Sequence, residues 1–109
     1  MDGLEKKWKK LLSDLQINFE EELSLKPILF LVGVQELSQG IRDFDKEEKT
    51  NLIHIAICRL LSEYGYYKFK SLDEDGWPHW EQVKDVGVLS ATDQTILLKK
   101  SILKYFDNY

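Results

Sequence analysis

The sequence predicts an all-α domain: four main helices in a compact bundle, with a long aromatic-rich loop between the third and the fourth. Four segments have the apolar patterns of helices, either residues that recur at steps of three and four or, in residues 28–34, a run that is apolar on all sides. Only two prolines and six glycines are present, too few for the many tight turns of a β-sandwich. A length of 109 residues with 43% hydrophobic content predicts a single globular domain, residues 1–109.

The first predicted helix covers residues 3–17 and is amphipathic. Its apolar stripe comprises Leu4, Trp8, Leu11, Leu12, Leu15 and Phe19, and it is flanked by Lys6, Lys7, Lys9 and Lys10. Most amphipathic helices pack on their own core, so we expect a bundle helix with solvated lysines. Attachment to an anionic membrane surface is the alternative.

The second predicted helix starts near Pro27, because proline suits a first helical turn, where its missing N–H is not needed. Residues 28–34 are apolar on all sides, which is typical of a helix at the centre of a fold. A buried strand is the alternative, since periodicity alone does not separate the two. In a helix, Gly33 would let a neighbouring backbone approach closely.

The third predicted helix has the clearest boundaries. Asp45 and Glu48 have the spacing of a capping box, and Gly65 is placed to end the helix. Its main stripe comprises Ile53, Ala56, Ile57, Leu60 and Tyr64. We expect this helix and the second to form a central antiparallel pair.

The fourth predicted helix starts near Ser90, a capping residue, and runs to about residue 106. Between the third and fourth helices lie some 25 residues with weak periodicity. A loop of this length is uncommon in a compact domain unless it is functional or contains short elements of its own. Residues 66–69 are a candidate for a short extended segment.

The charge and the cysteine content exclude several classes of function. A formal net charge of −4 disfavours nucleic acid as a partner. The apolar run at residues 28–34 is too short to span a bilayer, and the first residues lack the apolar core of a secretory signal. The single cysteine, Cys58, excludes an internal disulfide and fits a reducing compartment. We therefore expect a cytoplasmic protein that is not a membrane protein.

No motif for catalysis is present in the sequence. It contains no glycine-rich phosphate loop, zincin motif or nucleophile elbow. Cys58 lies in mid-helix among apolar residues, an environment that raises the pKa of a thiol and makes it a poor nucleophile. We expect no catalytic residue, no cofactor and a non-enzymatic role.

The segment from residue 66 to residue 81 is the main candidate for a functional site. Residues 64–80 hold six of the thirteen aromatic residues beside an acidic turn at residues 73–76. Aromatic rings with polar tips are typical of recognition surfaces. The predicted partner-binding residues are Tyr66, Tyr67, Asp73, Asp75, Trp77, His79, Trp80 and Glu81. The sequence thus predicts a module that binds a protein partner or a second copy of itself, with Trp77 largely buried and Trp80 meeting the ligand.

The alternative is a small-molecule or metal site below this loop. His54 and Cys58 are four residues apart and share a helix face, a spacing that can chelate a transition metal. His79 and Asp75 would complete the site from the loop. A calcium loop starting at Ser71 fails at its twelfth position, where Gln82 replaces glutamate, so a solvated turn is expected there.

Overall fold

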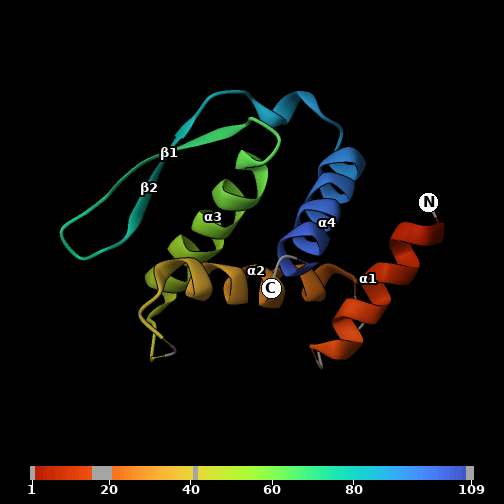
Figure 1. The fold of residues 1–109 in the computed structure, drawn as a ribbon, viewed down its shortest axis with the longest axis horizontal. Coiled ribbons are helices and arrows are strands. Elements are labelled where there is room, and N and C mark those ends of the chain that lie inside the picture. The colour runs from red at the N-terminus through yellow and green to blue at the C-terminus, as the bar shows by residue number, and fades with distance from the viewer. Residues whose placement is uncertain (1, 16–20, 41, 108–109) are drawn as a thin grey trace.

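The computed structural model describes residues 2–15, 21–40 and 42–107. Its elements are, in chain order, α1 (Asp2–Asp14), α2 (Glu21–Leu37), α3 (Lys46–Ser62), β1 (Tyr67–Leu72), β2 (Pro78–Gln82), the 3₁₀ helix η1 (Val86–Val88) and α4 (Ala91–Asp107). In Figure 1, α2 lies beneath α3 and α4, with α1 at one end of the molecule and the two strands at the other.

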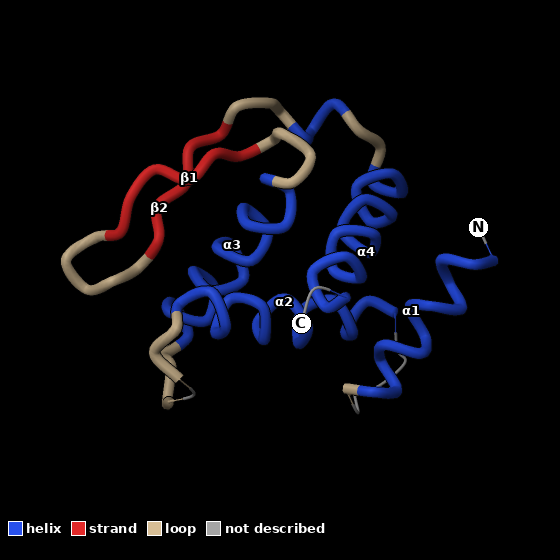
Figure 2. Tube along the Cα trace, in the orientation of Figure 1, coloured by secondary structure: helices blue, strands red, loops and turns tan. Residues whose placement is uncertain are grey.

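The predicted all-α class is wrong, because the segment between α3 and α4 is not a simple loop. It contains an antiparallel hairpin of β1 and β2, followed by η1 (Figure 2). Phe69 pairs with Trp80 across the hairpin, and their rings meet edge to face with centroids 5.5 Å apart. Such cross-strand aromatic pairs stabilise hairpins, so the aromatic residues that we assigned to a loop help to build the sheet. The four predicted helices are all present.

The helix boundaries follow the local signals, with one exception. Asp45 and Glu48 form the predicted capping box of α3, and Gly65 has a φ of 81° just after this helix. Ser90 Oγ accepts a hydrogen bond from Asp93 N at the start of α4. The start of α2 is wrong, since Pro27 lies inside the helix and not in its first turn. Residues 28–34 are helical, as preferred, and the predicted end of the first helix at residue 17 falls outside the described residues.

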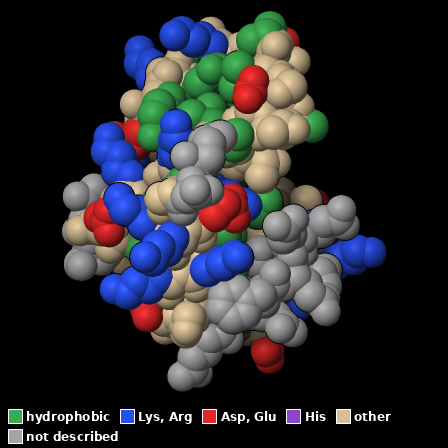
Figure 3. Space-filling view, turned by 90° about the vertical axis from the view of Figure 1, so that its right-hand side faces the viewer, with side chains coloured by type: hydrophobic (Ala, Val, Ile, Leu, Met, Phe, Trp, Pro, Cys, Tyr) green, Lys and Arg blue, Asp and Glu red, His purple; other side chains and the backbone are tan. Residues whose placement is uncertain are grey.

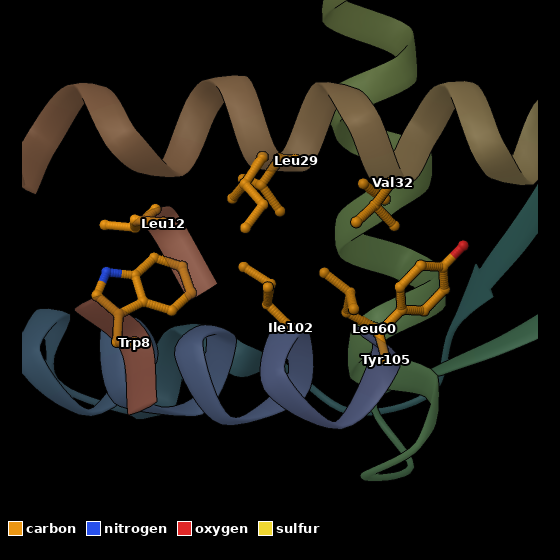
Figure 4. Packing of buried hydrophobic residues seen from close by; sticks show 9 residues of the cluster. Trp8, Leu12, Leu29, Val32, Leu60, Ile102 and Tyr105 are labelled. Carbon is orange, nitrogen blue, oxygen red and sulfur yellow. The ribbon is translucent and has the colours of Figure 1, made fainter. Parts of the chain in front are cut away.

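The predicted antiparallel pairing of α2 and α3 is wrong, because the two helices cross steeply (Figures 1 and 4). The crossing point is Gly33. A Cβ atom there would overlap the carbonyl oxygen of Leu52 and lie 2.7 Å from its carbonyl carbon. Gly33 therefore allows the close backbone approach that the sequence predicts. The approach occurs where the two helices cross and not along the length of an antiparallel pair.

The main core lies between α1, α2, α3 and α4 (Figure 4). Its buried residues are Trp8, Leu12, Ile28, Leu29, Val32, Ala56, Leu60, Ile102 and Tyr105. A second cluster comprises Val34, Leu37, Phe44 and Leu52, and Trp77 from the hairpin packs against it. The hairpin thus contributes one indole ring to the apolar packing and lies outside the main core.

Ion pairs connect the helices around the core. The largely buried Lys99 Nζ lies 3.2 Å from Glu5 Oε1 and over the ring of Trp8, which fastens α1 to α4. The Tyr105 hydroxyl donates to Glu36 at 2.8 Å and so joins α4 to α2. The Lys99–Glu5 pair and the burial of Trp8 and Leu12 confirm that α1 packs on the core of its own chain, as expected from its apolar stripe.

Candidate functional site

A cleft of about 480 Å³ lies between the N-terminal half of α3 and the hairpin. Its lining comprises the carboxylates of Asp45, Glu47, Glu48, Asp73 and Asp75, the indoles of Trp77 and Trp80, the imidazoles of His54 and His79, and Asn51, Ile55 and Pro78. Neither lysine nor arginine is among these lining residues. An aromatic cleft with five carboxylates favours a cationic ligand.

The α3 wall of the cleft is fixed by the capping box. Asp45 Oδ1 accepts from Glu48 N at 2.8 Å, and Glu48 Oε1 accepts from Asp45 N at 3.1 Å. Arg42 also pairs with Glu48 at 3.2 Å. Within the described part of the chain, the Glu47 carboxylate has neither an ion pair nor a hydrogen bond. Glu47 is therefore the acid of this wall that is available to a ligand.

The hairpin wall is fixed by Asp73, which organises the turn. Its Oδ1 accepts from the backbone N–H groups of Asp75 and Trp77, both at 2.9 Å. Its Oδ2 lies 3.0 Å from His79 Nε2, and this hydrogen bond lowers the pKa of Asp73, with help from the N–H of Trp77. Together with Gly76, whose φ is 84°, these bonds form the expected solvated turn.

A side chain from the segment that follows α2 connects the hairpin turn to the helical part of the molecule. Gln39 Nε2 donates to the backbone oxygen of Asp75 at 2.8 Å. The Asp75 carboxylate itself has no partner among the residues that the structure describes. The position of Asp75 is therefore held by its backbone, and the residue lines the cleft with a carboxylate that has no ion pair in the described structure.

Both tryptophans are half-buried and contribute to the cleft wall. Trp77 packs on the second apolar cluster, as a residue expected to be largely buried would do, but part of its surface stays accessible. Trp80 contacts Phe69 edge to face. Its Nε1 is buried and lacks a hydrogen-bond partner among the described residues. A donor left unpaired in this way is costly, so the indole is not an optimal core side chain at this position.

The structure brings most of the predicted partner-binding residues together. Asp73, Asp75, Trp77, His79 and Trp80 all line the cleft. Tyr66, Tyr67 and Glu81 do not. Lys84 lies over the ring of Tyr66, and the rings of Tyr67 and His54 meet edge to face. Glu81 is exposed beside Trp80 on β2.

The α3 half of the cleft was not predicted as part of the partner-binding surface. Glu47, Asn51 and His54 recur at steps of four and three, which places them on one helix face. That spacing is a usable signal, but the sequence pattern identifies Asp45 and Glu48 only as a helix cap and His54 only as a candidate metal ligand. Nothing in the sequence shows that the hairpin lies opposite this face.

The predicted ligands of the alternative metal site do not form one cluster but take part in two separate side-chain contacts. His54 Nε2 lies 3.5 Å from Cys58 Sγ, whereas His79 is paired with Asp73. Burial raises the pKa of the Cys58 thiol to about 11, so the thiolate that a metal requires is disfavoured. Among residues 2–15, 21–40 and 42–107, no three His, Cys, Asp or Glu side chains are grouped so that they could hold a metal ion.

Two further findings concern the chain beyond this cleft. In the described ranges, no helix has both the length and the apolar character needed to cross a membrane. Comparison of the chain with family models, curated proteins and solved structures finds no match.

Proposed function

We propose that the protein is a non-enzymatic interaction module that binds a basic segment of a protein partner in the cleft between α3 and the hairpin. The observation that supports this proposal is the composition of the cleft, which combines five carboxylates with two indoles and includes no lysine or arginine. A cationic side chain would find opposite charge and an aromatic surface in the same place. Carboxylates alone would attract any cation, and the indoles add the preference for an organic one.

The energetics favour a lysine or arginine side chain as the inserted group. A cation over an indole contributes roughly 0.5–1 kcal/mol at an exposed site, and about 2 kcal/mol when the cation is desolvated. Both side chains have long apolar stems that can lie along the ring while the charged end reaches a carboxylate. Glu47 and Asp75 suit this contact, since neither has another partner in the described residues.

The walls of the cleft are held by hydrogen bonds that do not depend on a ligand. Asp45 and Glu48 fix the start of α3, Asp73 fixes the turn, and Gln39 attaches the turn to the segment that follows α2. A cleft that is already arranged loses little conformational entropy on binding. This arrangement supports recognition of a short basic segment without a large rearrangement of the cleft.

The direct test is titration of the protein with a fluorescent lysine-rich peptide and with a glutamate-rich peptide of equal length. We expect anisotropy to report binding of the lysine-rich peptide alone, weakening as NaCl rises from about 0.05 M to about 0.5 M because salt screens exposed charges. Binding of both peptides, or of neither, would contradict the proposal. A free diamine that binds as tightly as the peptide would indicate a small-molecule site instead.

Matched variants place the binding in the cleft. The double variant Glu47→Gln and Asp75→Asn removes two carboxylates that pair with no described residue, and we expect about a tenfold loss of affinity, or about 1.4 kcal/mol. Glu74→Gln is the control, because Glu74 lies in the same turn but does not line the cleft. Trp80→Phe removes the unpaired N–H and keeps a ring, so it should fold and bind more weakly. If Glu74→Gln lowered the affinity for the peptide as much as each cleft variant does, the affinity would depend on net charge alone and not on the cleft.

A further inference from the structure

We infer that the basic segment recognised by the cleft is the lysine face of α1 in a second copy of this chain, so that the copies associate head to tail. This inference rests on the proposed function, because it assumes that the cleft binds cationic side chains. It adds the identity of the partner and the geometry of the assembly.

The lysine face of α1 consists of Lys6, Lys9 and Lys10, which lie within one turn at helical spacing. All three are exposed, whereas Trp8 and Leu12 on the opposite side of the helix are buried in the core. None of the three has an ion pair among the described residues, although Lys99 and Lys104 pair with Glu5 and Glu63. The lysine face therefore carries three charges that no described residue pairs with, on a helix that packs against the core.

The lysine face and the cleft lie at opposite ends of the molecule. Figure 1 places α1 at one end of the longest axis and the hairpin with the start of α3 at the other, and the molecule extends 44 Å along that axis. Figure 3 views the α1 end directly and shows Lys and Arg side chains spread over it. The lysine face cannot reach the cleft of its own chain, so the complementarity must be satisfied between molecules.

The contacts between copies follow from the groups that are left unpaired on each side. Lysine ammonium groups of one copy would approach Glu47 and Asp75 of the next, and their stems would lie against Trp80. An anionic membrane is the competing partner for the lysine face. It is disfavoured because insertion would require apolar residues on the same helix, and Trp8 and Leu12 are already committed to the core.

Because the cleft and the lysine face are different surfaces, the predicted contact is heterologous. Heterologous contacts generate open chains or closed rings and do not stop at a symmetric dimer. The driving force is mainly electrostatic between exposed groups, so association should be favoured by low salt and by high protein concentration.

The test is light scattering coupled to size exclusion, over a range of protein concentrations at low and high salt. One variant carries Glu47→Gln and Asp75→Asn, which weakens the cleft, and another carries Lys6→Gln, Lys9→Gln and Lys10→Gln, which removes the lysine face. We expect the wild type to form oligomers at low salt and each variant to stay monomeric. An equal mixture of the two variants should form a dimer and nothing larger, because only one intact cleft then meets one intact lysine face.

A control variant and a peptide titration separate the possible failures. Lys68→Gln, Lys70→Gln and Lys100→Gln remove three other exposed lysines and should leave association intact. A wild type that is monomeric at every salt concentration, yet binds the lysine-rich peptide, would overturn the inference and leave the proposed function standing. Failure to bind the peptide as well would overturn both. Binding of α1 lysines to anionic vesicles without self-association would also overturn the inference.

Discussion

At the scale of single residues, the acids of the cleft divide into those that hold the fold and those that are left to a ligand. Asp45, Glu48 and Asp73 accept backbone hydrogen bonds, so their charges are partly satisfied inside the molecule. Glu47 and Asp75 contribute charge alone in the described structure. This division explains why substitutions at Glu47 and Asp75 can test binding without testing folding at the same time.

Cys58 provides a prediction about pH. Burial raises its pKa from 9.0 to about 11, so the folded state holds the proton more tightly than the unfolded state does. The stability associated with this difference is fully present below pH 9 and is lost as pH rises through about 11. We expect the urea midpoint of the wild type to fall more steeply between these pH values than that of Cys58→Ala, which lacks the thiol.

Thiol labelling gives an independent measurement of the same site. Cys58 is 1% exposed, so an aromatic disulfide reagent should react far more slowly with the native protein than with the urea-unfolded chain at about pH 8. Rapid labelling of the native protein, or identical pH profiles for wild type and Cys58→Ala, would contradict the assigned environment.

At the scale of elements, the sequence predicts helices well because their signals are local. The capping box at Asp45, the cap at Ser90 and the glycine at Gly65 each lie where the structure has a helix end. The start of α2 was missed because tertiary packing of residues 28–34 retains Pro27 within the helix despite the loss of one backbone hydrogen bond. Local signals thus decide boundaries only where packing does not oppose them.

The hairpin was missed because its strands do not show a clear apolar–polar alternation. Nearly every residue of β1 is exposed, and the register shifts between Phe69 and Ser71, which interrupts the period of two. The aromatic and acidic residues of the cleft could be identified from the sequence, since they are concentrated in one segment. The position of these residues opposite the α3 face around Glu47 could not be predicted, because it depends on how the hairpin folds back against α3.

The crossing of α2 and α3 provides a prediction at the element scale. Gly33→Ala should destabilise the protein by about 1–3 kcal/mol, since the added methyl group meets the backbone of Leu52 and forces the helices apart. The substitution does so although alanine favours a helix by about 1 kcal/mol relative to glycine. Urea unfolding followed by circular dichroism measures the difference.

Gly3→Ala is the matched control for this prediction. Gly3 is also helical, but a Cβ atom there would meet nothing within 4 Å. We expect Gly3→Ala to be neutral or slightly stabilising. If both substitutions had the same effect, the close approach of Leu52 to Gly33 would not limit the packing of α2.

At the scale of the whole molecule, the cleft joins two parts of unequal stability. One wall belongs to α3, whose residues enter the main core, and the other belongs to a two-stranded hairpin outside that core. A two-stranded hairpin is only marginally stable by itself, so this one depends on the packing of Trp77 and the bond from Gln39. The proposed binding site therefore lies where we expect local opening to require the least free energy.

The lower stability of the hairpin relative to the helices predicts the pattern of native-state hydrogen exchange. Amides in β1 and β2 should exchange through openings of lower free energy than those in α2 and α3, because few buried contacts resist separation of the hairpin from α3. Gln39→Ala should lower hairpin protection further, whereas Gln35→Ala, in the last turn of α2, should not, since the Gln35 side chain is exposed and makes no hydrogen bond to the hairpin in the described residues. A bound lysine-rich peptide should raise protection in the hairpin more than in α4, because it contacts both walls of the cleft. Equal exchange free energies for hairpin and helices would mean that the molecule opens as one unit, and the cleft would then be as rigid as the core.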